Sequence, residues 1–270
     1  MERKDKGYAS IDDIYANPFM KMLIQVAANI VLTKKSINST FTEGEKSILE
    51  LYQSVRNIMS CVNDIRMAIV FSKHFDKQYL SKNEVNEEQY MTYHYDTIIH
   101  KLSTIKDLEF KIVAQIYNLT TNKFGNCSWN TIDKNRERIN NEKLFSFFEN
   151  ELYKEFIFYF DKKRNKSTHE GEISISEFND VSGELLLRDI SKNSLYNNIP
   201  GSSYANSYYV SQLINKDRKK MVRKMEQMYQ SCLNLIYIFF NSLFEDLSNV
   251  FTLDVKKNYS KTIAAVFKDL

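Results

Sequence analysis

The stretch that decides the fold is TEGEKSILELYQSVRNIMSCVNDIRMAI, residues 42–69. It begins with Thr42 and, three positions later, Glu45, a spacing typical of the capping box at the start of a helix. Apolar residues then recur at alternating spacings of three and four, which places them on one face of an α-helix. We therefore expect a helix of about 30 residues, about 45 Å long, with one apolar seam. The seam consists of Ile48, Leu51, Val55, Ile58, Val62, Ile65 and Ile69.

Similar signals predict four more long helices. Asn17 and Pro18 read as the N-cap and first residue of a helix that runs to about residue 35. A further helix is expected from about residue 91 to residues 124–126, with Glu109 as a charged residue within its apolar seam. The last two are predicted from about residue 141 into the polar segment 162–172, and over about residues 207–250.

The composition agrees with an all-α class. Only six glycines and two prolines occur in 270 residues, which favours long helices over the many tight turns of a β-protein. We predict an elongated helical bundle of about five long helices in a single domain, residues 1–270. Residues 1–125 supply its N-terminal helices, residues 170–205 form an irregular flap between the last two helices, and a short extra helix follows Lys256.

Charge, cysteine content and hydropathy narrow the class of protein. The formal net charge of +3 does not by itself indicate a polyanion partner. Three cysteines without a C-x-x-C spacing are expected to be free thiols of a cytoplasmic protein. The apolar run 19–32 is short and carries Lys21, Gln25 and Asn29, so we predict a core helix and no membrane association.

Common catalytic and metal motifs are not found in the sequence. His94 and His100 are six positions apart, whereas helical ligand pairs share a face at spacings of three or four. His74 has no second ligand nearby, and the glycines do not form a phosphate-binding loop. We therefore expect no metal ion and no cofactor.

One short motif does carry chemistry. The run Arg164-Asn165-Lys166-Ser167-Thr168-His169 resembles the R-x4-6-H motif of the HEPN superfamily, α-helical bundles of which many are metal-independent ribonucleases. In that family the Arg closes one long helix, the His falls in the turn beyond it, and another long helix follows. The resemblance covers about residues 140–250, and it implies that Arg164, Asn165 and His169 are catalytic.

The residue types suit RNA cleavage by attack of the 2′-hydroxyl on the adjacent phosphate. His169 titrates near neutral pH and can act as general acid or base, while Arg164 can clamp phosphate oxygens and Asn165 can position the substrate. The reaction moves protons at two places, and HEPN enzymes act as dimers, so we expect a homodimer with a composite cleft. We expect RNA to be held by basic residues beside the motif and on the last helix: Lys162, Lys163, Lys166, Lys219, Lys220 and Arg223.

The same resemblance suggests a toxin or anti-phage effector, with an antitoxin or regulatory partner that the sequence does not identify. Glu170 follows His169 where toxins paired with nucleotidyltransferases often have a Tyr shortly after the His, which speaks against that partnership. Two alternatives stay open. The chain could be a non-catalytic RNA-binding or protein-interaction bundle, in which the basic runs are only solvated helix surfaces. It could also be a scaffold that oligomerises through the Ile48 to Ile69 seam.

Overall fold

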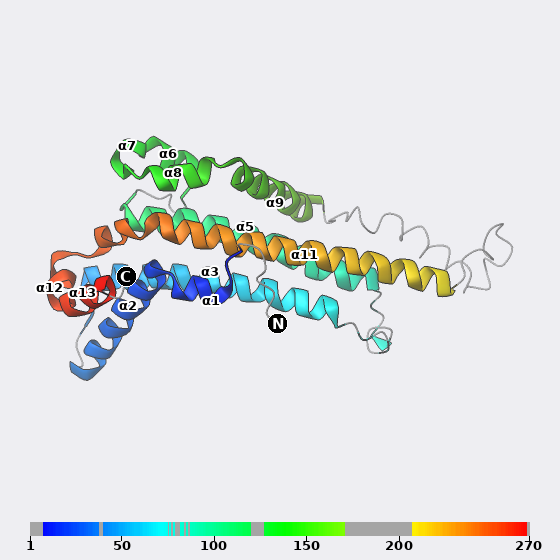
Figure 1. Cartoon of the computed structure of the whole chain (residues 1–270), viewed down its shortest axis with the longest axis horizontal. Helices are drawn as coiled ribbons and strands as arrows, with labels where there is room; N and C mark the ends of the chain where they lie inside the picture. The colour runs from blue at the N-terminus through cyan, green and yellow to red at the C-terminus, as the bar shows by residue number, and fades with distance from the viewer. Residues whose placement is uncertain are drawn as a thin grey trace. The chain divides into compact units, whose positions relative to one another are not determined.

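The computed structural model is all-α (Figure 1) and describes residues 8–37, 40–74, 76, 78, 82–83, 85, 87–119, 127–170 and 207–268. For residues 166–170 and 207–214 it describes the helical backbone and not the side chains. No β-strand occurs in these ranges, so the predicted all-α class is confirmed. Apart from Glu170, the predicted flap at 170–205 lies outside the described residues.

The chain divides into two compact units. Unit 1 contains residues 1–63, 101–160 and 230–270, and unit 2 contains residues 64–100 and 161–229. The helices α3 (Glu43–Lys73), α5 (Glu87–Ile116), α9 (Glu151–Glu170) and α11 (Ser207–Leu243) each contribute residues to both units. The prediction of a single domain therefore stays a prediction.

The other helices whose bounds the structure describes lie in unit 1, and α2 is the long helix among them. These elements are α1 (Ile11–Ala16), α2 (Pro18–Ile37), α6 (Trp129–Lys134), α7 (Arg136–Ile139), α8 (Glu142–Glu149), the 3-10 helix η4 (Glu245–Val250), α12 (Leu253–Asn258) and α13 (Ser260–Lys268).

The capping box at Thr42 is confirmed. The Thr42 hydroxyl accepts a hydrogen bond from the Glu45 N–H at 3.2 Å, and the Glu45 carboxylate accepts one from the Thr42 N–H at 2.7 Å. Glu45 also forms an ion pair with Lys34 of α2 at 3.0 Å and accepts from the Tyr259 hydroxyl at 2.8 Å. Burial alone would raise the pKa of Glu45, but these hydrogen bonds lower it, so the charged carboxylate joins three segments of unit 1.

The apolar seam of α3 faces inward along its whole length. All seven predicted residues, Ile48 to Ile69, are at most 5% exposed. The seam is therefore covered by other parts of the same chain. The scaffold hypothesis required this apolar face to pair between chains, so its burial argues against that hypothesis.

Three predicted helix ends are wrong. The helix α5 ends at Ile116 rather than near residues 124–126, and α11 ends at Leu243 and is followed by η4. The helix expected from Asn141 to the polar segment is two helices, because Asn150 ends α8 and its side chain accepts a hydrogen bond from the Leu152 N–H at 2.9 Å. Asn side chains compete with helical hydrogen bonds in this way, so a single Asn can divide a helix.

Glu109 is the acidic residue in the seam of α5, and it is only 2% exposed. Its carboxyl accepts a hydrogen bond from the Tyr153 hydroxyl of α9 at 2.7 Å. Burial raises the pKa of Glu109 to about 8, although the Tyr153 hydrogen bond and the charge of Lys106 both lower it. Below that pH the carboxyl is neutral, which is how an acid can occupy an apolar core.

This burial makes folding stability depend on pH. The unfolded carboxyl ionises near pH 4.5, whereas the folded one keeps its proton until about pH 8. The folded state therefore binds more protons over that interval, and its stability falls as the pH rises, by at most about 1.4 kcal/mol per pH unit. We expect Glu109→Gln to remove this fall, as measured by urea unfolding at intervals from pH 5 to pH 8.

The exposed carboxylate Glu142 provides the control through Glu142→Gln. The unfolding free energy of wild type should fall steadily relative to that of Glu109→Gln as the pH rises, while the control tracks wild type. Parallel curves for wild type and Glu109→Gln would show that Glu109 is charged in the folded protein.

Candidate functional site

The catalytic residues predicted from the sequence lie at the C-terminal end of α9, within unit 2. Lys162 and Asn165 are exposed, and Lys163 and Arg164 are half-buried. His169 and Lys166 lie on the helical backbone, but their side chains are outside the described residues. The structure therefore describes Arg164 and Asn165 as surface groups of α9, and the predicted contact between Arg164 and His169 stays a prediction.

The helix continues farther than the family resemblance implied. It runs to Glu170, so position 169 is in its last turn and not in a turn beyond it. At 3.6 residues per turn, positions 164 and 169 lie about 140° apart around the helix axis and about 7.5 Å apart along it. They therefore occupy different faces of α9, and the straight helix of one chain does not aim both at one phosphate group.

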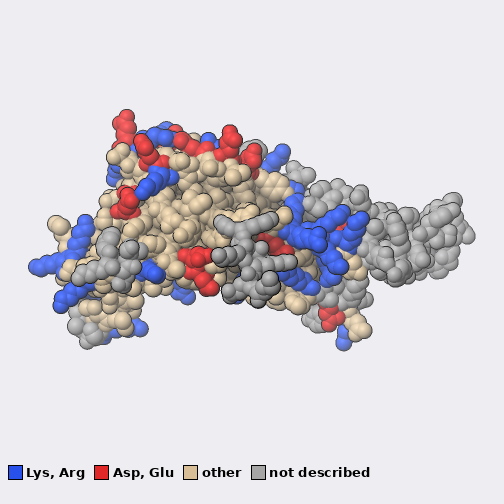
Figure 2. Space-filling model, in the orientation of Figure 1, with Lys and Arg blue, Asp and Glu red and all other residues tan. Residues whose placement is uncertain are grey.

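A basic stretch on α11, residues 216–224, belongs to the same unit. It contains six Lys and Arg residues against the single acid Asp217. This part of α11 is gold in Figure 1, and Figure 2 shows Lys and Arg gathered over it. Lys219, Lys220 and Arg223 are exposed. Lys220 pairs with Asp217 at 3.4 Å, whereas Lys219 and Arg223 have no ion pair within the described part of the chain.

The structure therefore brings two groups of predicted RNA-binding residues into one compact unit: the end of α9 and the basic stretch of α11. Lys162, Lys219, Lys220 and Arg223 are exposed cations among them. The field of such a cluster attracts phosphate groups and depends on salt.

His94, one of the other histidines, has a packing role. It is 7% exposed and is surrounded by the rings of Phe71, Tyr90 and Tyr93, with centroid distances of 5.8, 4.4 and 5.3 Å. Burial lowers its pKa, and its Nε2 has no hydrogen-bond partner among the described residues, which fits a neutral imidazole. His100 lies 3.4 Å from Asp96, and no group of three or more potential metal ligands occurs among the described residues.

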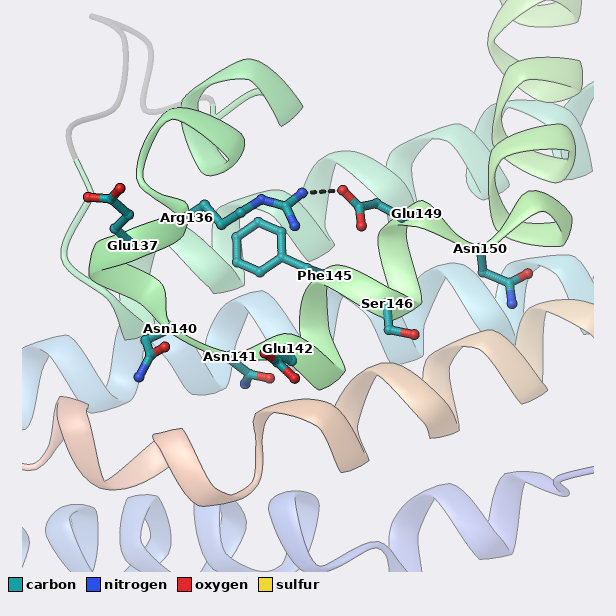
Figure 3. Close-up of a pocket in the computed structure, with 9 residues that line it drawn as sticks. All are labelled: Arg136, Glu137, Asn140, Asn141, Glu142, Phe145, Ser146, Glu149 and Asn150. Atoms are coloured by element: carbon teal, nitrogen blue, oxygen red, sulfur yellow. Dashed lines mark hydrogen bonds and ion pairs between the residues drawn. The ribbon is translucent and has the colours of Figure 1, made fainter.

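A pocket of unit 1 with a volume of about 570 Å³ lies around α7 and α8 (Figure 3). Arg136 is its central cation. The guanidinium lies over the Phe145 ring, 4.1 Å from the centroid, and forms ion pairs with Glu149 and with Asp133, the latter at 3.1 Å. The hydrogen bond that Arg136 donates to Glu149 raises the pKa of Arg136, and burial partly opposes this.

Structural contacts also occupy the amides beside this pocket. Asn141 caps α8 by accepting from the Leu144 N–H at 2.8 Å and donates to the Ser242 carbonyl at 2.8 Å. Asn150 caps the next helix. With Glu137, Glu142 and Glu149 around one cation, the pocket is acidic and suits neither RNA nor phosphate.

Sequence reasoning had not singled out Arg136 or the Glu109–Tyr153 pair. Arg136 is one of nine arginines, and the short helix α7 that carries it was not predicted. Glu109 did give a signal, as a charged residue at an apolar seam position.

Comparison of the chain with protein-family models, curated proteins and solved structures finds no match. In the part of the chain that the structure describes, none of the helices has both the length and the hydrophobicity needed to cross a membrane.

Because Arg136 is neutralised by its neighbours, we assign it a structural role. Exposed ion pairs contribute little to stability, so Arg136→Ala should lower Tm by on the order of one or two degrees. Its affinity for single-stranded RNA should equal that of wild type, as measured by fluorescence anisotropy. A several-fold loss of RNA affinity in a folded Arg136→Ala protein would contradict this assignment.

Proposed function

We propose that the chain is an RNA-cleaving protein of HEPN type that acts as a dimer without a metal ion, with Arg164 and His169 as its catalytic pair. The observation that carries the proposal is the Arg164 to His169 motif at the end of α9, in the same compact unit as the basic stretch of α11. A cleaving group and a surface for the RNA backbone are both needed, and unit 2 supplies candidates for each.

In the proposed reaction the 2′-oxygen of one nucleotide attacks the adjacent phosphorus, and the bond from phosphorus to the 5′-oxygen of the next nucleotide breaks. The imidazole of one His169 removes the 2′-hydroxyl proton, and a protonated imidazole gives a proton to the leaving 5′-oxygen. Arg164 holds the non-bridging oxygens, whose negative charge grows in the transition state. The products are a 2′,3′-cyclic phosphate and a 5′-hydroxyl end.

The helical geometry supports a site shared between two chains. Positions 164 and 169 lie on different faces of α9, so one chain presents either the Arg or the His toward a given phosphate more readily than both. A symmetric dimer can place Arg164 of one copy beside His169 of the other and supply the second imidazole as well.

The biological use follows from the same resemblance and belongs to the proposal. Cleavage of RNA would suit a toxin or anti-phage effector, whose activity an antitoxin or regulatory protein would hold in check.

RNA binding without cleavage is the second candidate. It is favoured by the continuation of α9 to Glu170, which leaves Arg164 and position 169 as separate points on a helix surface. In that case both residues add only to a basic surface.

Cleavage of total RNA in EDTA tests the main proposal. Purified wild type should cut and leave 2′,3′-cyclic phosphates, and Arg164→Ala and His169→Ala should each lower the rate by about 100-fold or more, because each removes a group needed in the transition state. Lys154→Ala, an exposed substitution on the same helix, is the matched control and should cut as wild type does. If wild type binds RNA but does not cut it, the second candidate function, RNA binding without cleavage, would replace the main proposal.

Mixing the two inactive variants tests the shared site. In a dimer of one Arg164→Ala chain and one His169→Ala chain, one of the two composite sites keeps Arg164 and one His169 and lacks only the second imidazole. After exchange of subunits half of the dimers are mixed, so activity should rise above that of either variant alone, to at most about a quarter of the wild-type value. A mixture as inactive as its components, although subunit exchange is demonstrated with labelled chains, would place Arg164 and His169 in one chain's own site.

A further inference from the structure

A second pocket lies within unit 2, between the C-terminal end of α3 and the basic stretch of α11. Its volume is about 290 Å³, and it is lined by Ser72, Lys73, Arg218, Lys219, Val222 and Arg223. Four of these six residues are cations. Because α3 and α11 bring together positions nearly 150 apart in the chain, the pocket is a product of the fold and not of one helix.

Two of the cations are held by carboxylates. Lys73 Nζ lies 2.5 Å from Glu226 Oε1, and Arg218 Nε lies 3.7 Å from Glu87 Oε1. Lys73 is also in the last turn of α3, where its charge offsets the negative pole of the helix. These two side chains therefore bring little uncompensated charge to the pocket.

Lys219 and Arg223 supply the remaining charge. They are one helical turn apart on α11, so they project from the same face of the helix, and both are exposed. Within the described residues neither forms an ion pair. The pocket thus has four cations against two carboxylates and keeps about two positive charges for a ligand.

The other lining groups limit the kind of ligand. The Ser72 hydroxyl already donates to the Ala68 carbonyl at 2.8 Å, so hydrogen bonds to an anion come from the cations. Val222 adds an apolar side chain that can contact a sugar or a base edge. The volume is slightly below that of sites that enclose whole small molecules, which suits one segment of a longer chain better than a free cofactor.

We propose that this pocket binds a phosphate group of the RNA strand through Lys219 and Arg223, with Arg218 as a further donor. The inference rests on the proposed function for the identity of the ligand, but it uses none of the residues assigned to cleavage. It divides the basic stretch of α11 into side chains that recognise phosphate and side chains, such as Lys220, that only add to the field.

Anisotropy with two labelled oligouridylates, one with a 5′-phosphate and one with a 5′-hydroxyl, tests the pocket. All proteins carry His169→Ala so that the strand stays intact. Lys219→Ala and Arg223→Ala should each weaken binding by about 5-fold and reduce the slope of log affinity against log salt by about one. Lys154→Ala, which removes the same charge from an exposed position of α9 outside the predicted RNA-binding residues, should leave the affinity within about twofold of wild type.

Equal losses on both oligonucleotides would assign the pocket to an internal phosphodiester, and a larger loss on the phosphorylated one would assign it to a terminal phosphate. An effect of Lys154→Ala equal to that of Lys219→Ala, or no effect of Lys219→Ala and Arg223→Ala, would overturn the proposed phosphate site. If the RNA-cleavage experiment fails, this binding experiment still tests the pocket, because it measures the affinity of variants that do not cut RNA. If cleavage depends on Arg164 but not on Arg223, the proposed function would be supported and the proposed phosphate pocket would not.

Discussion

The hydrogen bond from Tyr153 to Glu109 is the constraint on which the core of unit 1 depends. Glu109 stands among the apolar residues of α5, where an ionised carboxylate would be costly and an unpaired neutral one also unfavourable. Tyr153, in the first turn of α9, satisfies it at 2.7 Å. Burial, together with the nearby Glu109 and Cys61, raises the pKa of the Cys232 thiol on α11, so α3, α5, α9 and α11 all contribute to one buried cluster. The helix that carries Arg164 is therefore anchored at its start by a neutral acid.

Helix starts could be predicted from the sequence better than helix ends. Thr42 with Glu45, and Asn17 with Pro18, are local signals, because a cap satisfies N–H groups that lie within three residues of it. The end of α5 at Ile116 and the division at Asn150 depend on which side chains find partners elsewhere in the fold. Asn150 could have continued a helix, and only its hydrogen bond to the Leu152 N–H shows that it begins a new one.

The candidate site, too, could be predicted only in part from the sequence. The motif at Arg164 and the basic stretch of α11 are visible as short runs of letters, since their chemistry lies in neighbouring residues. Which of those cations retain free charge is not visible, because it depends on Glu87 and Glu226, acids of other helices or other turns. The family resemblance placed His169 in a turn beyond the helix, whereas α9 continues through position 169. The residues of the motif were therefore identified from the sequence, but their geometry was not.

The two pockets show why positive residues alone do not identify a phosphate site. Arg136 has a stacked ring and two carboxylates around it, so a phosphate there would have to displace contacts that already satisfy the guanidinium. Lys219 and Arg223 have no such partners among the described residues, and a phosphate would displace only water and counterions. The free energy of binding a phosphate depends on this difference in what is lost as well as on the number of cations that are gained. The acids near a basic surface therefore decide where a polyanion can bind as much as the bases do, and the described acids of this chain leave the pocket beside α11 open.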